Sequence, residues 1–269
     1  CEQYPQTDAF ADRVRHEAET MVRRLRNHAS LALWCGGNET DEVYAWNDRD
    51  CDPNDDRITR QVLPDVVRQL HAECVYLPNS PYISPDLVQD PDRARRPEDH
   101  LWRNADFRHP LYADSPARFI SEVGFQGCPV RATVEQMLDA DHIWPWQGDR
   151  QWLTKAVRPL PDSSDFTYRI DLMAEVIKVF FGVVPEDLDN FILASQLVQA
   201  EALKFFVERM RIRKGDCSRI IWWNLRDGWP IFSDAVVDYY FRPKLAYHVL
   251  RNVQQDVLAM IGDSTDGFH

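Results

Sequence analysis

Apolar and polar positions follow two different periods along this chain, and the two periods predict its elements. Short continuous apolar runs bounded by turn residues are typical of strands buried on both faces of a sheet. Apolar positions that recur every three or four residues are typical of helices packed on one face. The alternation of the two patterns predicts an α/β fold. The apolar runs predict strands at Leu31, Cys74, Leu101, Ala117 and Arg219. The helical spacing predicts helices at residues 8–27, 58–72, 168–181, 185–213 and 238–251.

Turn and cap residues mark several ends of these elements, whereas two segments remain ambiguous. Pro185 opens a run with two acids, which is a good first helical turn, and Gly215 is suited to a helix C-cap. The three residues from Arg242 to Lys244 look like a helix start. Residues 134–138 and 151–157 are too short to assign, and the polar tail beyond Ile261 is expected to be frayed.

One polar pair follows the first apolar run directly. The stretch L-A-L-W-C-G-G-N-E ends in Asn38 and Glu39, and two glycines before them allow the backbone to bend. A second acid, Glu122, follows the apolar run at residues 117–121. Because α/β folds place active sites at the carboxyl ends of their strands, we expect both glutamates at a functional site.

Composition limits the class of protein without identifying a partner. With 44% apolar residues in 269, the chain can bury a full core, and one domain is expected at residues 1–255 with a polar tail at 256–269. A net charge of −12 argues against nucleic acid or an anionic membrane as the main partner. The six cysteines are scattered without metal-site spacing and are expected to be free buried thiols. The cellular location stays unknown.

Two carboxylates on different strands suit the hydrolysis of a glycosidic bond. One protonates the leaving oxygen, and the other attacks the sugar or activates water; retaining enzymes hold them about 5–5.5 Å apart. Trp223 can stack beneath a sugar ring, although core packing is an equal alternative. Trp102 and Trp46 are further aromatic candidates for substrate binding. Motifs of serine hydrolases, of zinc proteases and of P-loop enzymes are absent from the sequence.

Three motifs together resemble family-2 glycoside hydrolases, in the branch that holds β-mannosidases and exo-β-glucosaminidases. They are H-x-S-L-A-L-W-C-G-G-N-E, S-E-V-G-F-Q, and W-W-N-L-R-D-G-W-P with D-Y-Y-F-R-P-K. The resemblance implies a (β/α)8 TIM barrel of which this chain holds strands four to eight. It also implies a retaining mechanism without metal or organic cofactor. In that mechanism Glu39 is the acid/base, Glu122 is the nucleophile, Asn38 binds the sugar 2-hydroxyl, and Trp223 is the sugar platform.

The same resemblance carries expectations about tuning and completeness. Glu39 must be protonated in the first step, so its pKa is expected to be raised by burial and by the negative neighbour. Leu101 stands where the family has a tyrosine that touches the nucleophile, so either the alignment shifts by one residue or Glu122 is tuned differently. Cys1 lies where the third strand should end, so the first strands and the amino-terminal β-domains are expected in a longer chain.

Several alternatives remain open at this level. A β-mannoside is the first expected substrate, and a β-glucosaminide or a substrate of the β-galactosidase or β-glucuronidase type is the alternative. Glucosaminide cleavage would use an extra acid, for which Asp41 and Glu42 are candidates if they are not solvated residues of a helix start. A degenerate homologue that only binds carbohydrate is the other class. The tryptophans Trp144, Trp146 and Trp229 are candidates for lining the pocket, with packing as an equal alternative. The barrel would place Asn79 and Ser80 on the active face, and His28 and His100 are expected to be structural.

Overall fold

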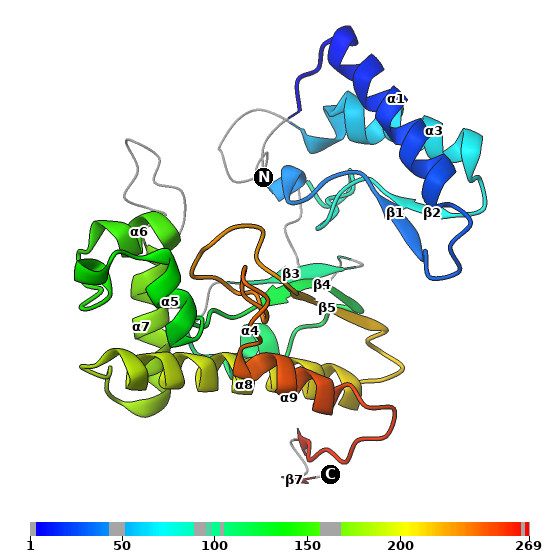
Figure 1. Cartoon of the computed structure of the whole chain (residues 1–269). Helices are drawn as coiled ribbons and strands as arrows, with labels where there is room; N and C mark the ends of the chain where they lie inside the picture. The colour runs from blue at the N-terminus through cyan, green and yellow to red at the C-terminus, as the bar shows by residue number, and fades with distance from the viewer. Residues whose placement is uncertain are drawn as a thin grey trace. The chain divides into compact units, whose positions relative to one another are not determined.

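A computed structural model describes residues 4–42, 52–88, 96, 98–102, 105–156, 168–264 and 267–268 (Figure 1). The chain divides into two compact units. The first consists of Cys1–His100 and Pro116–Ser121, and the second consists of Leu101–Ser115 and Glu122–His269. Trp46, which the sequence offers as a substrate-binding candidate, lies outside the described residues.

The first unit contains a helix pair and a parallel strand pair. Helix α1 (Asp8–Leu25) begins at Thr7, whose side chain accepts a hydrogen bond from the Phe10 backbone, and it packs along α3 (Leu63–Leu70) (Figure 1). A π-helical turn, η2 (Ile58–Val62), leads into α3, and the 3-10 turn η1 (Pro53–Asp55) precedes it. Strand β1 (Leu33–Cys35) pairs in parallel with β2 (Val75–Leu77). The predicted strand-then-helix alternation is confirmed here.

Three further strands form a second sheet in the order β3-β4-β5, with β3 at Asp99–Leu101, β4 at Phe119–Gly124 and β5 at Arg219–Trp223. All five predicted strands are therefore present. Every pairing in these two sheets joins strands that are consecutive along the chain, as they are in a (β/α)8 barrel. One boundary was wrong: Glu122 lies inside β4 rather than after it, because the strand continues to Gly124.

The second unit is mostly helical. Its long helix α8 (Leu188–Ile212) is buried along much of its length and packs against α7 (Tyr168–Phe181) and α9 (Leu245–Val253), as Figure 1 shows. The two ambiguous segments are helices α5 (Arg131–Met137) and α6 (Arg150–Ala156). The sequence pattern did not predict the short elements α4 (Pro110–Ala113) and η4 (Ala140–His142).

Four predicted ends in this unit need correction. Helix α8 begins at Leu188, because the Asp187 side chain caps the Asn190 backbone and leaves Pro185 outside. Helix α9 begins at Leu245 after the N-cap Lys244, so the predicted start near Asp238 was wrong although the assignment of residues 242–244 was right. The tail predicted to be frayed contains an antiparallel pair, β6 (Asp263–Ser264) with β7 (Gly267–Phe268). The C-cap of α8 is Arg213 rather than the predicted Gly215, which lies two residues later with a positive φ of 117°.

An aromatic cluster fills the core of the second unit. Trp152 is fully buried and stacks on Phe232 with ring centroids 4.1 Å apart. Trp144 and Trp146 pack against Phe191 in the same cluster, so packing and not a sugar pocket accounts for both. Among the described cysteines, all of them free, Cys128 and Cys217 are buried but Cys35 is exposed. No helix within the described ranges has both the length and the apolar character required to cross a membrane.

Candidate functional site

The turn that presents Glu39 depends on close backbone packing. A Cβ atom at Gly36 would lie 2.1 Å from the Tyr76 hydroxyl, and one at Gly37 would lie 2.6 Å from the Asn79 amide oxygen. Neither glycine has a positive φ. The two glycines are therefore required because neighbouring atoms approach the backbone, rather than because the chain needs a left-handed bend there.

The left-handed bend falls on Glu39 itself, whose φ is 55°. Such a conformation costs a non-glycine residue about 1 kcal/mol or more, so the surroundings must hold it. The Glu39 backbone N–H donates to the Ser80 carbonyl at 2.7 Å, and the Ser80 N–H donates to the Gly37 carbonyl at 3.0 Å. The buried Asn79 side chain accepts from the Thr40 hydroxyl at 2.8 Å. Asn79 and Ser80, which follow β2, thus hold the turn that carries Glu39 after β1.

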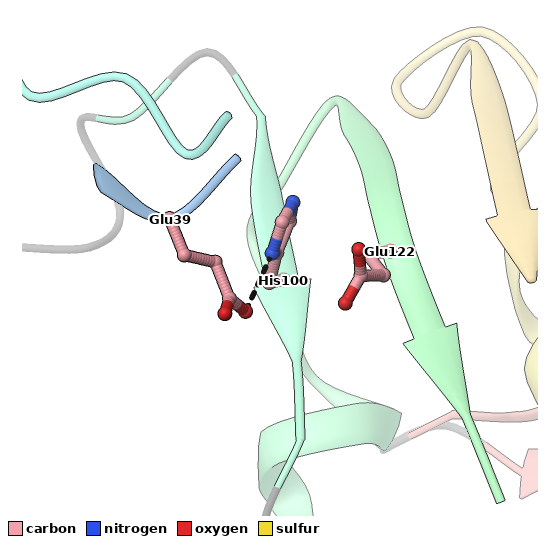
Figure 2. A group of neighbouring side chains, drawn as sticks. All are labelled: Glu39, His100 and Glu122. Carbon is pink, nitrogen blue, oxygen red and sulfur yellow. Dashed lines mark hydrogen bonds and ion pairs between the residues drawn. The ribbon is translucent and has the colours of Figure 1, made fainter. Parts of the chain in front are cut away.

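His100 contacts the carboxylate of Glu39. Its Nδ1 lies 3.0 Å from Glu39 Oε1, and Figure 2 draws this hydrogen bond. The His100 side chain is 3% exposed, whereas that of Glu39 is 20% exposed and so keeps a path to solvent. The sequence pattern favoured a structural role for His100, and it missed this contact. One feature of the sequence could have indicated this contact. His100 lies on a predicted strand, next to Leu101, which aligns with the family tyrosine.

The two acids after Glu39 are buried in ion pairs. Asp41 accepts from Arg60 at 2.6 Å and from the Ile83 backbone at 2.9 Å, and Glu42 accepts from Arg96 at 2.8 Å. Burial raises the pKa of the Asp41 carboxyl, and the hydrogen bond from Arg60 opposes that rise. The prediction that these two acids are solvated was therefore wrong, although both lie in a helical turn. Both carboxylates also have partners of their own, which disfavours them as ligands of a substrate amine.

Glu122 has a different kind of partner. The indole N–H of Trp102 donates to Glu122 Oε1 at 2.8 Å, while Leu101 is buried and 3% exposed. A Cβ atom at Gly124 would lie 2.3 Å from the Trp102 ring, so the glycine leaves room for the indole beside β4. The hydrogen bond that Leu101 cannot donate to Glu122 is donated by the next residue, Trp102.

The remaining substrate-binding candidates are exposed to solvent. Asn38 is exposed and forms a β-bridge with Ser80, and Trp223 is 46% exposed at the end of β5. Trp229 is 42% exposed, with the Lys155 ammonium 5.8 Å from its ring centroid. Solvent access suits Trp223 and Asn38 for ligand binding, and their roles stay predictions. Asn38 and Glu39 belong to the first unit, whereas Trp102, Glu122 and Trp223 belong to the second.

A buried lysine connects the segments that follow β4 and β5. Lys244 is fully buried, and its ammonium donates to the carbonyls of Gly127 at 2.6 Å and Ser233 at 3.0 Å. Asp227 accepts from the Ser233 hydroxyl at 2.6 Å. Burial lowers the pKa of Lys244 and raises that of Asp227. Ser233 thus connects the motif R-D-G-W-P, through Asp227, to the motif D-Y-Y-F-R-P-K, through Lys244. The spacing of the motifs in the sequence did not predict this connection.

Comparison with known proteins gives a consistent set of relatives. The chain is 28% identical over 272 residues to β-mannosidase B of Aspergillus terreus, a match that covers 94% of this chain and 31% of that protein. It is 27% identical over 276 residues to β-mannosidase B of Aspergillus oryzae, covering 96% of this chain and 31% of that protein. No family model matches the chain.

Solved structures agree with these relatives. The crystal structure of β-D-mannosidase from Dictyoglomus thermophilum matches 97% of this chain and 31% of that chain, with 30% identity and a TM-score of 0.82. The exo-chitosanase CsxA of Amycolatopsis orientalis matches with 18% identity and a TM-score of 0.66, which supports the fold alone. These similarities confirm the resemblance to the β-mannosidase branch of family-2 glycoside hydrolases, and the chain spans about a third of its relatives' length.

Proposed function

We propose that this chain, given its similarity to β-mannosidases, carries the catalytic residues of a retaining exo-β-glycosidase that acts on terminal β-mannosides. Glu39 is the acid/base, and Glu122 is the nucleophile. The partial TIM barrel that the resemblance implies would hold them. Trp223 and Asn38 are the candidate contacts to the sugar.

One observation carries this proposal: Glu122 contacts a group that only donates hydrogen bonds, whereas Glu39 contacts a group that can accept one. The indole N–H of Trp102 can only donate, so it stabilises the ionised form of Glu122 that a nucleophile requires. The Nδ1 atom of His100 can accept, so it is compatible with a protonated Glu39 that can act as an acid. Two carboxyl groups in contrasting environments are the usual arrangement for acid and nucleophile on one sugar.

The reaction would proceed in two displacements. Glu122 attacks C1 of the sugar while Glu39 gives its proton to the glycosidic oxygen, and the C1–O bond breaks. A covalent glycosyl ester on Glu122 results. Glu39, now a carboxylate, takes a proton from water, and the hydroxide oxygen attacks C1 and breaks the ester. The chemistry needs only these two side chains and water.

A β-mannoside is proposed ahead of a β-glucosaminide because the acids closest in sequence to Glu39 have partners. Asp41 and Glu42 are buried with Arg60 and Arg96, so neither offers a free carboxylate to a substrate amine. A panel of p-nitrophenyl β-glycosides, assayed with the full-length gene product, tests this choice. The β-mannoside should turn over fastest. Faster turnover of the β-glucosaminide would overturn the substrate, and no turnover of any glycoside would favour the degenerate homologue.

We also propose that the active protein includes sequence beyond these residues, because the matched relatives are about three times as long. Isolated residues 1–269 should then be less stable and less active than the full-length gene product. Thermal melting and turnover of the isolated chain provide the measurement. A monodisperse, cooperatively melting and fully active product of residues 1–269 would contradict this part of the proposal.

A further inference from the structure

A second glutamate, Glu98, lies in the first unit without a role in the proposed reaction. It is 2% exposed, which is unusual for a carboxyl group. Its Oε1 accepts from the Tyr82 backbone at 2.8 Å, and its Oε2 accepts from the Ser80 hydroxyl at 2.8 Å and from the Ser121 hydroxyl. These three donors suit an ionised carboxylate.

The Ser80 hydroxyl connects Glu98 to His100. Ser80 Oγ lies 3.0 Å from His100 Nε2, and the other ring nitrogen of the same histidine faces Glu39. The continuous series is therefore Glu98, Ser80, His100 and Glu39, all in one unit. Because a serine has a single proton and Glu98 accepts it, Ser80 must accept from His100 Nε2–H.

This assignment fixes the protons on the histidine. With a hydrogen on Nε2, a neutral His100 presents a lone pair at Nδ1. A 3.0 Å contact between that nitrogen and Glu39 Oε1 then needs one proton between the two atoms. The proton resides on the Glu39 carboxyl or on His100, so the two groups hold it as a pair.

We propose that the buried Glu98 is a positioning residue that acts through Ser80 and His100 to keep a proton available to Glu39. The inference rests on the proposed acid/base role of Glu39. When Glu39 gives its proton to the leaving oxygen, the pair holds none. When Glu39 then takes a proton from water, the pair holds one again. The pair keeps its proton to higher pH than Glu39 alone would, because Nδ1 accepts it.

Replacement of Glu98 by glutamine tests the proton assignment directly. In Glu98→Gln the amide offers donors of its own, so Ser80 can turn its hydroxyl to donate to Nε2. His100 then carries its proton on Nδ1 and donates to Glu39, which stabilises the carboxylate. The alkaline limb of the pH profile of kcat/KM should move down by about one pH unit, as expected for one charge-assisted hydrogen bond.

Leaving-group dependence separates positioning from a general structural effect. Loss of kcat/KM in Glu98→Gln should be about tenfold or more for a mannoside with a poor, alkyl leaving group, which needs the acid. It should be small for 2,4-dinitrophenyl β-mannoside, whose leaving group needs no proton. Equal loss on both substrates with an unmoved alkaline limb would overturn the inference.

One further variant and one spectroscopic measurement keep the test decisive if Glu98→Gln does not fold. Ser80→Ala removes the hydroxyl that connects Glu98 to His100 and changes the side-chain volume little. It should move the alkaline limb of the pH profile of kcat/KM in the same direction as Glu98→Gln. Direct ¹⁵N NMR of histidine-labelled protein should show His100 protonated on Nε2 in the wild type, with the signal assigned by its absence in His100→Gln. Protonation on Nδ1 in the wild type would contradict the assignment.

Matched controls come from another histidine–glutamate pair of the same unit. His71 Nε2 lies 3.7 Å from the exposed Glu73 carboxylate, outside the series. Glu73→Gln and His71→Gln should leave the alkaline limb in place. Failure of the proposed function is recognised separately: Glu39→Ala would then lose no activity on either leaving group. The other outcome is that Glu39→Ala loses more activity on poor than on good leaving groups while the alkaline limb of Glu98→Gln does not move. That outcome would refute only the inference about Glu98.

Discussion

The surroundings of Glu39 and of Glu122 differ in almost every physical respect. Glu39 lies in a left-handed turn held by backbone hydrogen bonds from a neighbouring loop, and it meets a buried histidine. Glu122 lies inside a regular strand and accepts a hydrogen bond from the indole N–H of Trp102. A histidine nitrogen can accept or donate, whereas an indole nitrogen only donates. These partners suit the proposed roles, in which Glu39 exchanges a proton and Glu122 stays ionised.

The same contrast extends to the residues behind each glutamate. Buried charges surround the Glu39 turn, where Asp41 with Arg60 and Glu98 with its hydroxyl donors replace solvent. Packing supports the Trp102–Glu122 contact, because only a glycine at position 124 leaves space for the indole. Under the proposed roles, polar contacts thus surround the acid/base, whereas close packing positions the hydrogen-bond donor of the nucleophile.

Removal of the nucleophile should have the largest effect. Glu122→Gln keeps the size of the side chain but cannot form the glycosyl ester, so turnover should fall by several orders of magnitude. Initial rates on p-nitrophenyl β-mannoside measure this loss. Glu135→Gln on α5, a partly exposed glutamate, is the control and should retain activity. A loss of only a few-fold in Glu122→Gln would exclude the nucleophile role.

Removal of the acid/base should have a large effect that depends on the substrate. Glu39→Ala should lose about 10²–10⁴-fold on poor leaving groups and much less on 2,4-dinitrophenyl β-mannoside. Added azide, which needs no base to attack the glycosyl ester, should restore turnover and yield a β-mannosyl azide. Glu17→Ala on the exposed face of α1 is the control. Identical losses on good and poor leaving groups, with no response to azide, would refute the assignment.

Loss of the indole donor should have a moderate effect on the anion site. Trp102→Phe keeps an aromatic ring but removes the N–H that stabilises the Glu122 carboxylate. The acid limb of kcat/KM should move to higher pH, and the rate below that limb should drop about tenfold, the scale of one hydrogen bond to a charged group. Trp34→Phe removes a similar N–H that donates to His71 and should leave the limb unchanged. An unmoved acid limb in Trp102→Phe would show that the indole does not tune Glu122.

Neutralisation of Asp41 should have the smallest effect and should appear as a pH-dependent stability. Because burial raises the pKa of folded Asp41, its favourable contribution is fully present below its unfolded pKa of about 4 and declines as pH rises through the folded pKa. The wild type should therefore gain Tm relative to Asp41→Asn as pH falls from 7 towards 4. Asp65→Asn on α3, a half-exposed pair with Arg68, is the control. A Tm difference independent of pH would contradict the raised pKa.

Local patterns were enough to predict most of the elements. Five apolar runs became five strands, and the helical spacing of residues 168–181 gave α7 with both of its ends. The predicted helix starts were wrong where a polar side chain outside the apolar pattern determines the start. Asp187 caps α8, so Pro185 lies outside the helix. The Asp238 side chain accepts a hydrogen bond from the Arg242 backbone in a turn, so α9 begins only after that turn.

The candidate site was predictable only in part, for a related reason. Glu39 and Glu122 follow recognisable runs, so their sequence positions reveal them. His100, Ser80 and Glu98 come together from separate segments, and no spacing in the sequence indicates that they share a proton path. The leucine at position 101 left the partner of Glu122 open in the sequence, and the structure places the indole N–H of Trp102, the residue after β3, on that carboxylate.

The most direct test of the assignment of the two glutamates is covalent trapping of the glycosyl-enzyme. The full-length gene product is treated with 2-deoxy-2-fluoro-β-mannosyl fluoride, digested and sequenced by mass spectrometry. The predicted result is a single 2-fluoromannosyl label on Glu122, accompanied by loss of activity. A label on Glu39, or an active enzyme that forms no glycosyl ester, would contradict the assignment of nucleophile and acid/base.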